Sequence, residues 1–201
     1  MRVSRIQAAE NRQTVINVAS RLFRLRGFDG IGLKDLMKGA GLTQGAFYKQ
    51  FASKEDLAVK ASRRALESAR LRWLAATAAK PEDPLRAVIA FYLSTDHREE
   101  KMDGCPIVAL GSDAARQSSN VKASFETGIR EYLELLGCWV GDADGEKPGS
   151  KTMAILSIMV GAVLLSRAVN DEHLSKRFLQ AAAESVMAVS SAGDAQLGPR
   201  Q

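Results

Sequence analysis

Apolar residues recur at helical spacing along most of the chain, and no segment shows the alternation that is typical of strands. A first amphipathic helix is predicted over 6–26 from the spacing of Val15, Ile16, Ala19, Leu22 and Phe23. Gly27 ends this helix. A second, shorter helix is predicted over 33–38, because Leu33, Leu36 and Met37 share one face.

A glycine-containing turn and a third short helix follow. A glycine in Gly39-Ala40-Gly41 can adopt the left-handed conformation that closes a helix. Thr43 is a candidate N-cap for a helix over 44–50. Phe47 and Phe51 lie four residues apart, so we expect them to anchor this helix to the two before it.

Six more helices complete an all-α chain of about nine helices. Ser53 is a candidate N-cap for the fourth, which we expect to reach about residue 79. The others are predicted over 83–95, 105–116, 121–140, 151–169 and 172–190. Polar loops are expected over 98–104 and 141–150, and a frayed tail over 191–201.

The N-terminal residues form a long motif. It reads Arg12-x-x-Val-Ile-x-Val-Ala-x-x-Leu-Phe-x-x-x-Gly-Phe, then Lys34-Asp-Leu, then Gly39-Ala-Gly-Leu-Thr-Gln-Gly-Ala-Phe-Tyr-Lys-Gln-Phe-x-Ser-Lys54-Glu-x-Leu57. This stretch resembles the helix-turn-helix DNA-binding domain of the TetR family of bacterial transcriptional regulators. The resemblance implies a DNA-binding domain over 1–53 and a ligand-binding and dimerisation domain over 54–201.

The resemblance also implies which residues meet DNA. Lys34 in the second helix and Gln44, Ala46 and Lys49 in the third would face base edges or nearby phosphates, and a second set would hold the DNA backbone: Thr43, Gly45, Tyr48 and Lys54. Glutamine can bond bidentately to adenine, and lysine can donate to guanine or phosphate. The alternative is that Tyr48 is a core residue and Lys49 a solvated surface residue.

Two family positions differ in this chain. The family usually has Thr or Ser where Ile31 and Gly32 stand, and these hydroxyls would cap the second helix and touch phosphate. Their absence removes one expected cap and one expected phosphate contact. The backbone amides of 32–34 are then the candidates to meet phosphate directly.

The distribution of charge supports a nucleic-acid partner. The net charge is +5, and residues 1–60 contain 11 Lys and Arg against 5 Asp and Glu, whereas residues 61–201 contain 17 against 18. A concentrated basic region is what phosphate neutralisation requires. A solvated basic face has the same composition, so the charge does not decide between them.

The apolar run from Met153 to Ser166 predicts a partner. It falls short of the roughly 20 residues that span a bilayer, so we expect a buried helix and no membrane association. Its apolar positions cover too much of the helix for a monomer surface. The resemblance places a homodimer interface on the last two helices, although burial within one subunit is the alternative. The N-terminus lacks the apolar segment of a signal peptide, which favours the cytoplasm.

The resemblance further implies that a small-molecule effector binds the C-terminal domain and releases an inverted-repeat operator. The candidate pocket residues are Trp73, Phe91, Tyr92, Met102, Cys105 and Phe125. Aromatic residues at helical spacing are also common core residues. We therefore expect a ligand-responsive homodimeric regulator, most simply a repressor, while an activating or non-releasing regulator would carry the same motif.

The two cysteines suggest a second mechanism. Cys105 precedes Pro106 at the expected start of a helix, where a thiolate could be stabilised, so an electrophile-sensing or redox-sensing repressor is the alternative. Cys138 lies in an apolar stretch and is expected to be inert. A helical enzyme with a Cys105 nucleophile lacks a base other than His97, and a dimeric interaction module is also open. His97 and His173 have no companions at metal-ligand spacing, so we expect no metal, no cofactor and no enzymatic activity.

Overall fold

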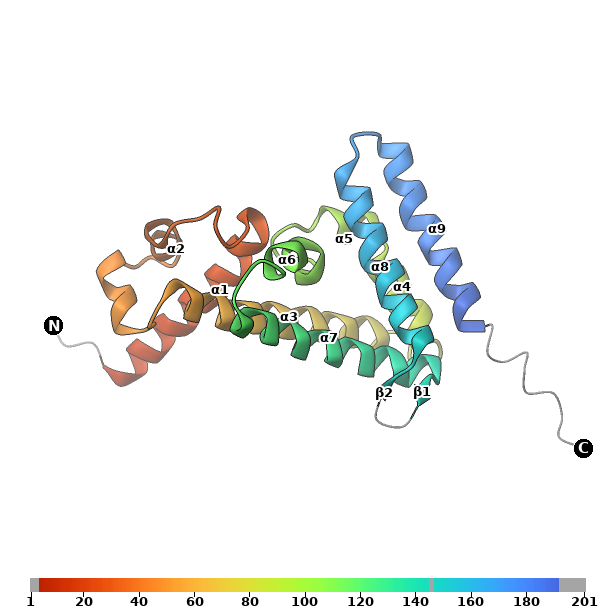
Figure 1. Ribbon diagram of the computed structural model, residues 1–201, viewed down its shortest axis with the longest axis horizontal. Coiled ribbons are helices and arrows are strands. Elements are labelled where there is room, and N and C mark those ends of the chain that lie inside the picture. Colours follow the sequence, from red (N-terminus) through yellow and green to blue (C-terminus); the bar gives the residue numbers. More distant parts are fainter. Residues whose placement is uncertain (1–3, 145–146, 192–201) are drawn as a thin grey trace, which may run out of the picture. The chain divides into compact units, whose positions relative to one another are not determined.

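The described chain is a set of helices whose order matches the sequence pattern. The structure is a computed structural model and describes residues 4–144 and 147–191. Its elements are α1 (Arg5–Arg26), α2 (Leu33–Gly39), the 3-10 helix η1 (Gln44–Lys49), α3 (Lys54–Ala78), α4 (Pro84–Tyr92), α5 (Thr95–Glu99), α6 (Pro106–Ala114), α7 (Ser119–Val140), α8 (Ser150–Ala168) and α9 (Glu172–Ser191) (Figure 1). The predicted all-α fold is confirmed.

Three segments differ from the sequence prediction. The third helix is a 3-10 helix. The predicted loop over 141–150 contains two-residue antiparallel strands, β1 (Ala143–Asp144) and β2 (Lys147–Pro148). The helix predicted over 83–95 ends at Tyr92, and a short helix, α5, occupies part of the predicted loop over 98–104. The expected frayed tail falls almost entirely outside the described residues.

A side-chain cap and buried polar residues stabilise α5. It has no apolar stripe, so the spacing of apolar residues did not predict it. The Ser94 side chain accepts from the backbone N–H of His97 at 3.1 Å and caps the first turn. The helix then buries His97 and Arg98, two polar residues, in place of an apolar stripe. The apolar pattern therefore placed residue 95 in the preceding helix and residues 98 and 99 in a loop.

The chain divides into two compact units, which are described separately. The first contains residues 1–69 and 101–128, and the second contains residues 70–100 and 129–201. Both α3 and α7 run from one unit into the other. The predicted division between residues 53 and 54 is a division by function and stays a prediction.

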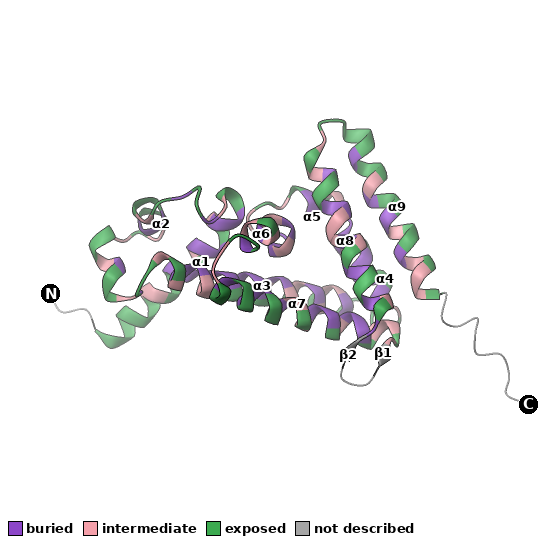
Figure 2. Cartoon of the chain, viewed as in Figure 1, coloured by how far each residue is buried: buried purple, intermediate pink, exposed green. Residues whose placement is uncertain are grey.

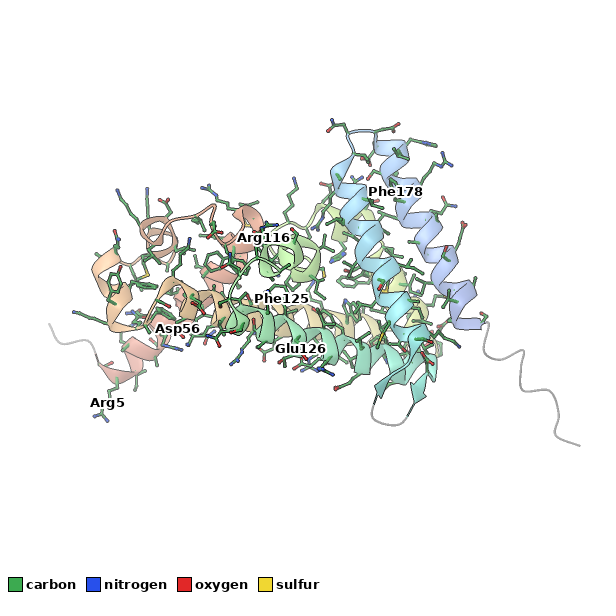
Figure 3. The ribbon with its side chains drawn as sticks, viewed as in Figure 1. Arg5, Asp56, Arg116, Phe125, Glu126 and Phe178 are labelled. Atoms are coloured by element: carbon green, nitrogen blue, oxygen red, sulfur yellow. The ribbon has the colours of Figure 1, made fainter. Side chains whose placement is uncertain are left out.

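The first unit surrounds one apolar cluster. Side chains from α1, α2, η1, α3, α6 and α7 meet there, among them Phe23, Leu36, Phe47, Leu57 and Phe125 (Phe125 is labelled in Figure 3). Burial of large apolar side chains contributes roughly 1.5–3 kcal/mol each. The three N-terminal helices are thus packed onto α6 and the start of α7, and do not stand alone.

Polar contacts add to this packing. The buried Arg24 of α1 donates to the carbonyl oxygen of Gly104 at 2.9 Å, just before α6 begins. The backbone N–H of Phe28 donates to Asp113 at the end of α6 at 3.4 Å. The hydroxyl of Ser118 donates to Glu55 of α3 at 2.6 Å. Each bond joins residues of 101–128 to the N-terminal helices.

In the second unit an aromatic cluster lies between α3, α4 and α7. The ring of Trp73 stacks on Tyr132 at 4.7 Å between centroids and meets Tyr92 edge-on at 5.5 Å. Helices α8 and α9 pack side by side (Figure 1), with Ile155, Met159 and Val163 of α8 buried. Aromatic packing of this kind rigidifies the region beyond simple area burial.

Helix α8 is the long apolar helix of the second unit. It has 19 residues and a mean hydropathy of 1.5, so by length and composition alone it reaches the range of a membrane span, and 39% of that window is buried. The run from Met153 to Ser166 was expected to be too short to span a bilayer. The observed helix, Ser150–Ala168, is longer than that run. Its packing on α9 is the arrangement of a core helix, and one such helix is weak evidence for a membrane.

Candidate nucleic-acid interface

The helix-turn-helix is formed by α2, the turn after it and η1. Gly41 has a φ of +70°, as predicted, and its backbone N–H donates to the carbonyl of Lys38 at 3.0 Å. The next N–H, from Leu42, donates to the carbonyl of Met37 at 2.9 Å. Helices commonly end at a left-handed residue, because the backbone N–H groups at and after it can donate to the last carbonyls of the helix. This ending fixes the direction in which the chain enters η1.

One face of η1 is anchored in the core. Phe47 is fully buried, and its ring stacks on Phe51 with 5.4 Å between centroids and an interplanar angle of 25°. The predicted anchoring role of the two phenylalanines is therefore confirmed. The Tyr48 ring meets Phe47 edge-on at 5.2 Å. This contact holds the base of the tyrosine ring against the core.

The opposite face of η1 is open. The side chains of Gln44, Tyr48 and Lys49 are exposed, as is Gly45, while Ala46 is half-buried. Tyr48 is 67% exposed, so it is not a core residue. The structure thus places a cation, an amide and a phenol next to one another on a short, rigid surface, which are the groups that bind bases and phosphates.

Thr43 occupies the predicted N-cap position, but its hydroxyl makes no capping bond. The threonine is exposed. Thr43 therefore lies at the exposed start of η1 with a hydroxyl that has no capping role. The predicted cap position is correct, and the predicted cap bond is wrong.

The start of α2 matches the expectation from the missing hydroxyls. Gly32 is the N-cap of α2 and makes no side-chain cap bond, and Ile31 is buried instead of presenting a hydroxyl. Lys34, in the first turn, is exposed. At this end of α2 only Lys34 and backbone amides are left to meet phosphate.

The start of α3 is capped from both sides. Ser53 accepts from the backbone N–H of Asp56 at 3.0 Å, as predicted, and Asp56 accepts from the backbone N–H of Ala52 at 3.3 Å. A hydrogen bond from Lys60 lowers the pKa of Asp56. Lys54 is half-buried and is the first residue of α3, with residues 50–53 between it and η1.

Helix α1 adds a residue that was not among the candidate DNA-binding residues. Arg12 donates from Nε to the carbonyl oxygen of Gln50 at 3.4 Å, and its guanidinium lies over the Phe51 ring at 5.1 Å. Both partners stand at the end of η1. Its sequence signal is only its place as the first residue of the N-terminal motif.

The six candidate ligand residues fall in both units. Trp73, Phe91 and Tyr92 belong to the second unit, where Trp73 and Tyr92 are buried and Phe91 is half-buried under the Arg72 guanidinium. The other three belong to the first unit: Met102, Cys105 and Phe125. Phe125 is part of the apolar cluster that also contains residues of α1, α2 and η1. A shared pocket for these six residues stays a prediction.

Neither cysteine forms a disulfide, and their environments differ. Cys105 is the N-cap residue of α6, as predicted from Pro106, and is 2% exposed. Cys138 lies near the end of α7 and is exposed. Over residues 4–144 and 147–191, no group of three His, Cys, Asp or Glu side chains is placed to hold a metal ion.

The chain is similar to known transcriptional regulators over most of its length. A family model described as bacterial regulatory proteins, tetR family, matches residues 15–61. The HTH-type transcriptional regulator LmrA of Bacillus subtilis is 25% identical over 169 residues, which cover 78% of this chain and 86% of that protein.

Solved structures show the same fold. A TetR transcriptional regulator from Chloroflexus aurantiacus superposes with a TM-score of 0.75 at 24% identity, covering 90% of this chain and 96% of that one. The reduced form of E. coli NemR gives a TM-score of 0.73 at 22% identity, covering 88% and 95%. The matched residues 15–61 contain the buried anchor and the open face of η1 described above, so the similarity to the tetR family of bacterial regulatory proteins falls on the segment that carries this surface.

Proposed function

We propose that this DNA-binding transcriptional regulator is a repressor that binds an inverted-repeat operator as a cytoplasmic homodimer and leaves it when a small-molecule effector binds. One observation carries the DNA-reading part. The 3-10 helix η1 is anchored by the fully buried Phe47, and it presents Gln44, Tyr48 and Lys49 to solvent. A reader fixed on one side and polar on the other needs little reorganisation to bind.

The residues proposed to touch DNA divide by role. Lys34, Gln44, Ala46 and Lys49 are assigned to base edges or adjacent phosphates. Thr43, Gly45, Tyr48 and Lys54 are assigned to the DNA backbone. The exposed Thr43 hydroxyl, which caps nothing within the protein, supports this second assignment.

The homodimer is proposed from the exposed apolar face of α8 and α9. Met153, Leu164 and Leu165 of α8 and Leu174 of α9 are all exposed, and Figure 2 shows exposed positions along both helices. The Phe178 side chain of α9 is labelled in Figure 3 and is half-buried. An apolar face of this size on a paired set of helices fits a second copy of the same face.

Effector release is proposed from the similarity to the tetR family and from the aromatic cluster of the second unit. Trp73, Tyr92 and Tyr132 give that unit a buried aromatic cluster. An effector of small apolar character suits such surroundings. An effector bound there releases DNA only if it has a higher affinity for the DNA-free conformation of the protein than for the DNA-bound one.

A thiol trigger at Cys105 is the second candidate. Its N-cap position and its place directly after Gly104, which accepts from Arg24 of α1, favour it. Burial opposes direct reaction with a bulky electrophile. Replacing Cys105 with Ser should abolish electrophile-induced release of DNA if the trigger is this thiol. Release that persists unchanged in the variant rules this candidate out.

Titration of duplex DNA tests the proposed function. Duplexes from the region upstream of the gene and random duplexes of equal length should be titrated at several salt concentrations. We expect one duplex to bind at least about a thousandfold more tightly than random DNA, with affinity falling steeply as salt rises. Ala at Lys49 or Tyr48 should remove this preference while the protein stays folded and dimeric. Equal affinity for every duplex contradicts the proposal.

A further inference from the structure

The C-terminal end of η1 is held by a side chain from another helix. Arg12 belongs to α1, 38 residues before Gln50, whose carbonyl oxygen accepts its Nε–H at 3.4 Å. Gln50 is the C-cap residue of η1. A cation at this position meets the negative end of the helix and a carbonyl that the helix leaves without an internal partner.

The same guanidinium also covers an aromatic ring. Its central carbon lies 5.1 Å from the centroid of Phe51, a distance at which a planar cation is attracted to the ring face. Phe51 stacks on Phe47, and Phe47 in turn contacts the ring of Tyr48. A continuous row of contacts therefore leads from Arg12 to the exposed tyrosine.

A 3-10 helix of six residues needs such support. Its hydrogen bonds are less well aligned than those of an α-helix, and runs longer than three or four residues are uncommon. The backbone N–H groups of Gln50 and Phe51 both donate to the carbonyl of Phe47, at 2.8 and 3.0 Å. Arg12 contacts the carbonyl oxygen of Gln50 and the ring of Phe51, so it restrains the same two residues at the end of η1.

The charge of Arg12 is also engaged within the protein. Asp56, in the first turn of α3, has its pKa lowered first by the hydrogen bond from Lys60 and, to a smaller extent, by the positive charge of Arg12. The Arg12 guanidinium thus contacts the end of η1 and acts weakly on the charge of Asp56 in α3. These partners all lie inside the first unit.

We propose that Arg12 is a positioning residue of the DNA reader: it fixes the end of η1, and through Phe51 and Phe47 the orientation of Tyr48 and Lys49, without itself binding the operator. This inference rests on the proposed function of η1. Its chemistry requires arginine in particular, because a lysine ammonium cannot both lie flat on the Phe51 ring and donate to the Gln50 carbonyl through a planar fork.

The matched variants are Arg12→Lys, Arg12→Ala and Arg26→Ala. Arg26 is an exposed arginine in the last turn of α1, so its replacement measures the loss of one charge from the same helix. Two quantities are measured for each. The first is hydrogen exchange at the amides of Gln50 and Phe51 in the free protein, and the second is affinity for the preferred duplex and for random DNA across a salt series.

Arg12→Lys should speed exchange at both amides about tenfold and weaken the preferred duplex about tenfold, the scale of one charged hydrogen bond and one cation–π contact. Binding to random DNA and the salt dependence should match the wild type. Arg26→Ala should leave both the exchange and the preference unchanged.

Three results overturn the proposal. Arg12→Lys with wild-type affinity and exchange shows that charge alone suffices. Arg12→Ala that weakens preferred and random DNA equally, with a salt slope smaller by about one, shows a direct phosphate contact. Unchanged exchange in both Arg12 variants shows that η1 does not depend on this residue. The exchange measurement uses no DNA, so a protein that fails to select any duplex refutes the proposed function separately.

Discussion

His97 is a buried polar residue whose protonation state is set by its surroundings. It is 3% exposed, and its Nδ1 lies 2.7 Å from the carbonyl oxygen of Tyr92, so Nδ1 carries the proton and donates it. Burial lowers the pKa of His97 to about 4; the Tyr92 carbonyl opposes this shift, and the charges of Arg167 and Arg72 add to it. The neutral ring is therefore the form that the fold accommodates.

This environment makes stability depend on pH. The unfolded chain protonates His97 near pH 6.5 and the folded chain only near pH 4, so stability is complete above pH 6.5 and is lost as the pH falls toward 4. At pH 5 the loss amounts to about 2 kcal/mol. Denaturant unfolding of the wild type and of His97→Gln at pH 7.5 and 5 should show this extra loss only in the wild type. His173 is exposed, so His173→Gln is the control and should lose as much stability between pH 7.5 and 5 as the wild type does. If His97→Gln also loses as much as the wild type, the pH dependence does not come from His97.

Gly128 is a residue whose lack of a side chain the packing requires. A Cβ built there lies 2.8 Å from both methyl carbons of Leu66 and 2.9 Å from its Cβ. Rotating the end of the Leu66 side chain cannot remove the clash with its Cβ, because the Cβ position is set by the backbone. Helices α3 and α7 approach closely at this point because residue 128 is glycine.

Gly128→Ala should therefore destabilise the protein by about 1–3 kcal/mol, as overpacking does. Gly137→Ala, on the same helix, meets no atom closer than 3.9 Å, so it should be neutral or stabilise by up to about 1 kcal/mol. Urea unfolding of both variants measures the difference. Equal free energies of unfolding for the two variants contradict this reading of the helix contact.

Residue roles that depend on local sequence were predictable. The Ser53 cap, the Gly41 turn and the Phe47 and Phe51 anchors all follow from neighbours within four positions, where propensity and spacing act. Arg12 and Gln50 are 38 residues apart, and nothing in one segment specifies the other. Contacts of that kind appear only when the fold brings helices together.

At the scale of elements, the α5 segment is held by side chains from two helices. The guanidinium of Arg167 in α8 donates to the carbonyl oxygens of His97, Arg98 and Glu100, at 3.0, 2.7 and 3.1 Å. Arg98 in turn donates to Glu172 of α9 at 2.9 Å and to Ser175 at 2.5 Å. The C-terminal end of α5 is thus capped by a cation from α8, which satisfies carbonyls that the helix leaves unpaired.

Arg167→Met keeps an unbranched but shorter side chain and removes the guanidinium that makes these three hydrogen bonds. We expect a loss of about 2 kcal/mol or more, because buried carbonyls lose bonds to a charged group. Hydrogen exchange at the α5 amides should accelerate more than exchange in α4. Arg177→Met, at an exposed site on α9, should change neither quantity. Retention of wild-type stability in Arg167→Met would show that α5 does not depend on this cap.

The helices that carry apolar stripes were predicted close to their observed ends, because burial of one face dictates their period. The first helix, predicted over 6–26, is observed over Arg5–Arg26, and the last, predicted over 172–190, over Glu172–Ser191. The exceptions are α5 and the 3-10 form of η1. Both are short, and their geometry is set by tertiary contacts instead of by periodicity.

At the scale of the whole molecule, the proposed dimer follows from apolar side chains that the described chain leaves uncovered. Leu164 of α8 is 50% exposed, and the adjacent Leu165 is also exposed. Covering such side chains contributes about 25 cal/mol per Å² of buried apolar area, before the cost of association. The sequence indicated this face through the excess of apolar positions, but not the identity of the partner.

Leu164→Glu should convert the protein to a monomer at micromolar concentration, since it would place a charge in the centre of the interface. Operator affinity should fall by more than about tenfold, because two readers no longer bind together. Leu71→Glu, at an exposed leucine of α3, is the control and should remain dimeric. Sedimentation at several concentrations measures the oligomeric state, and a dimeric Leu164→Glu protein contradicts the proposed interface.

Selection of bound sequences from a random duplex library tests the central claim most directly. The account predicts one enriched motif, an inverted repeat whose half-sites are centred about 10–10.5 base pairs apart or a multiple of that spacing. Lys49→Ala should lose enrichment at the same positions in both half-sites, while the overall fold is retained. A wild-type selection without an enriched motif, or a motif that Lys49→Ala and Tyr48→Ala leave unchanged, would contradict the assignment of η1 as the DNA reader.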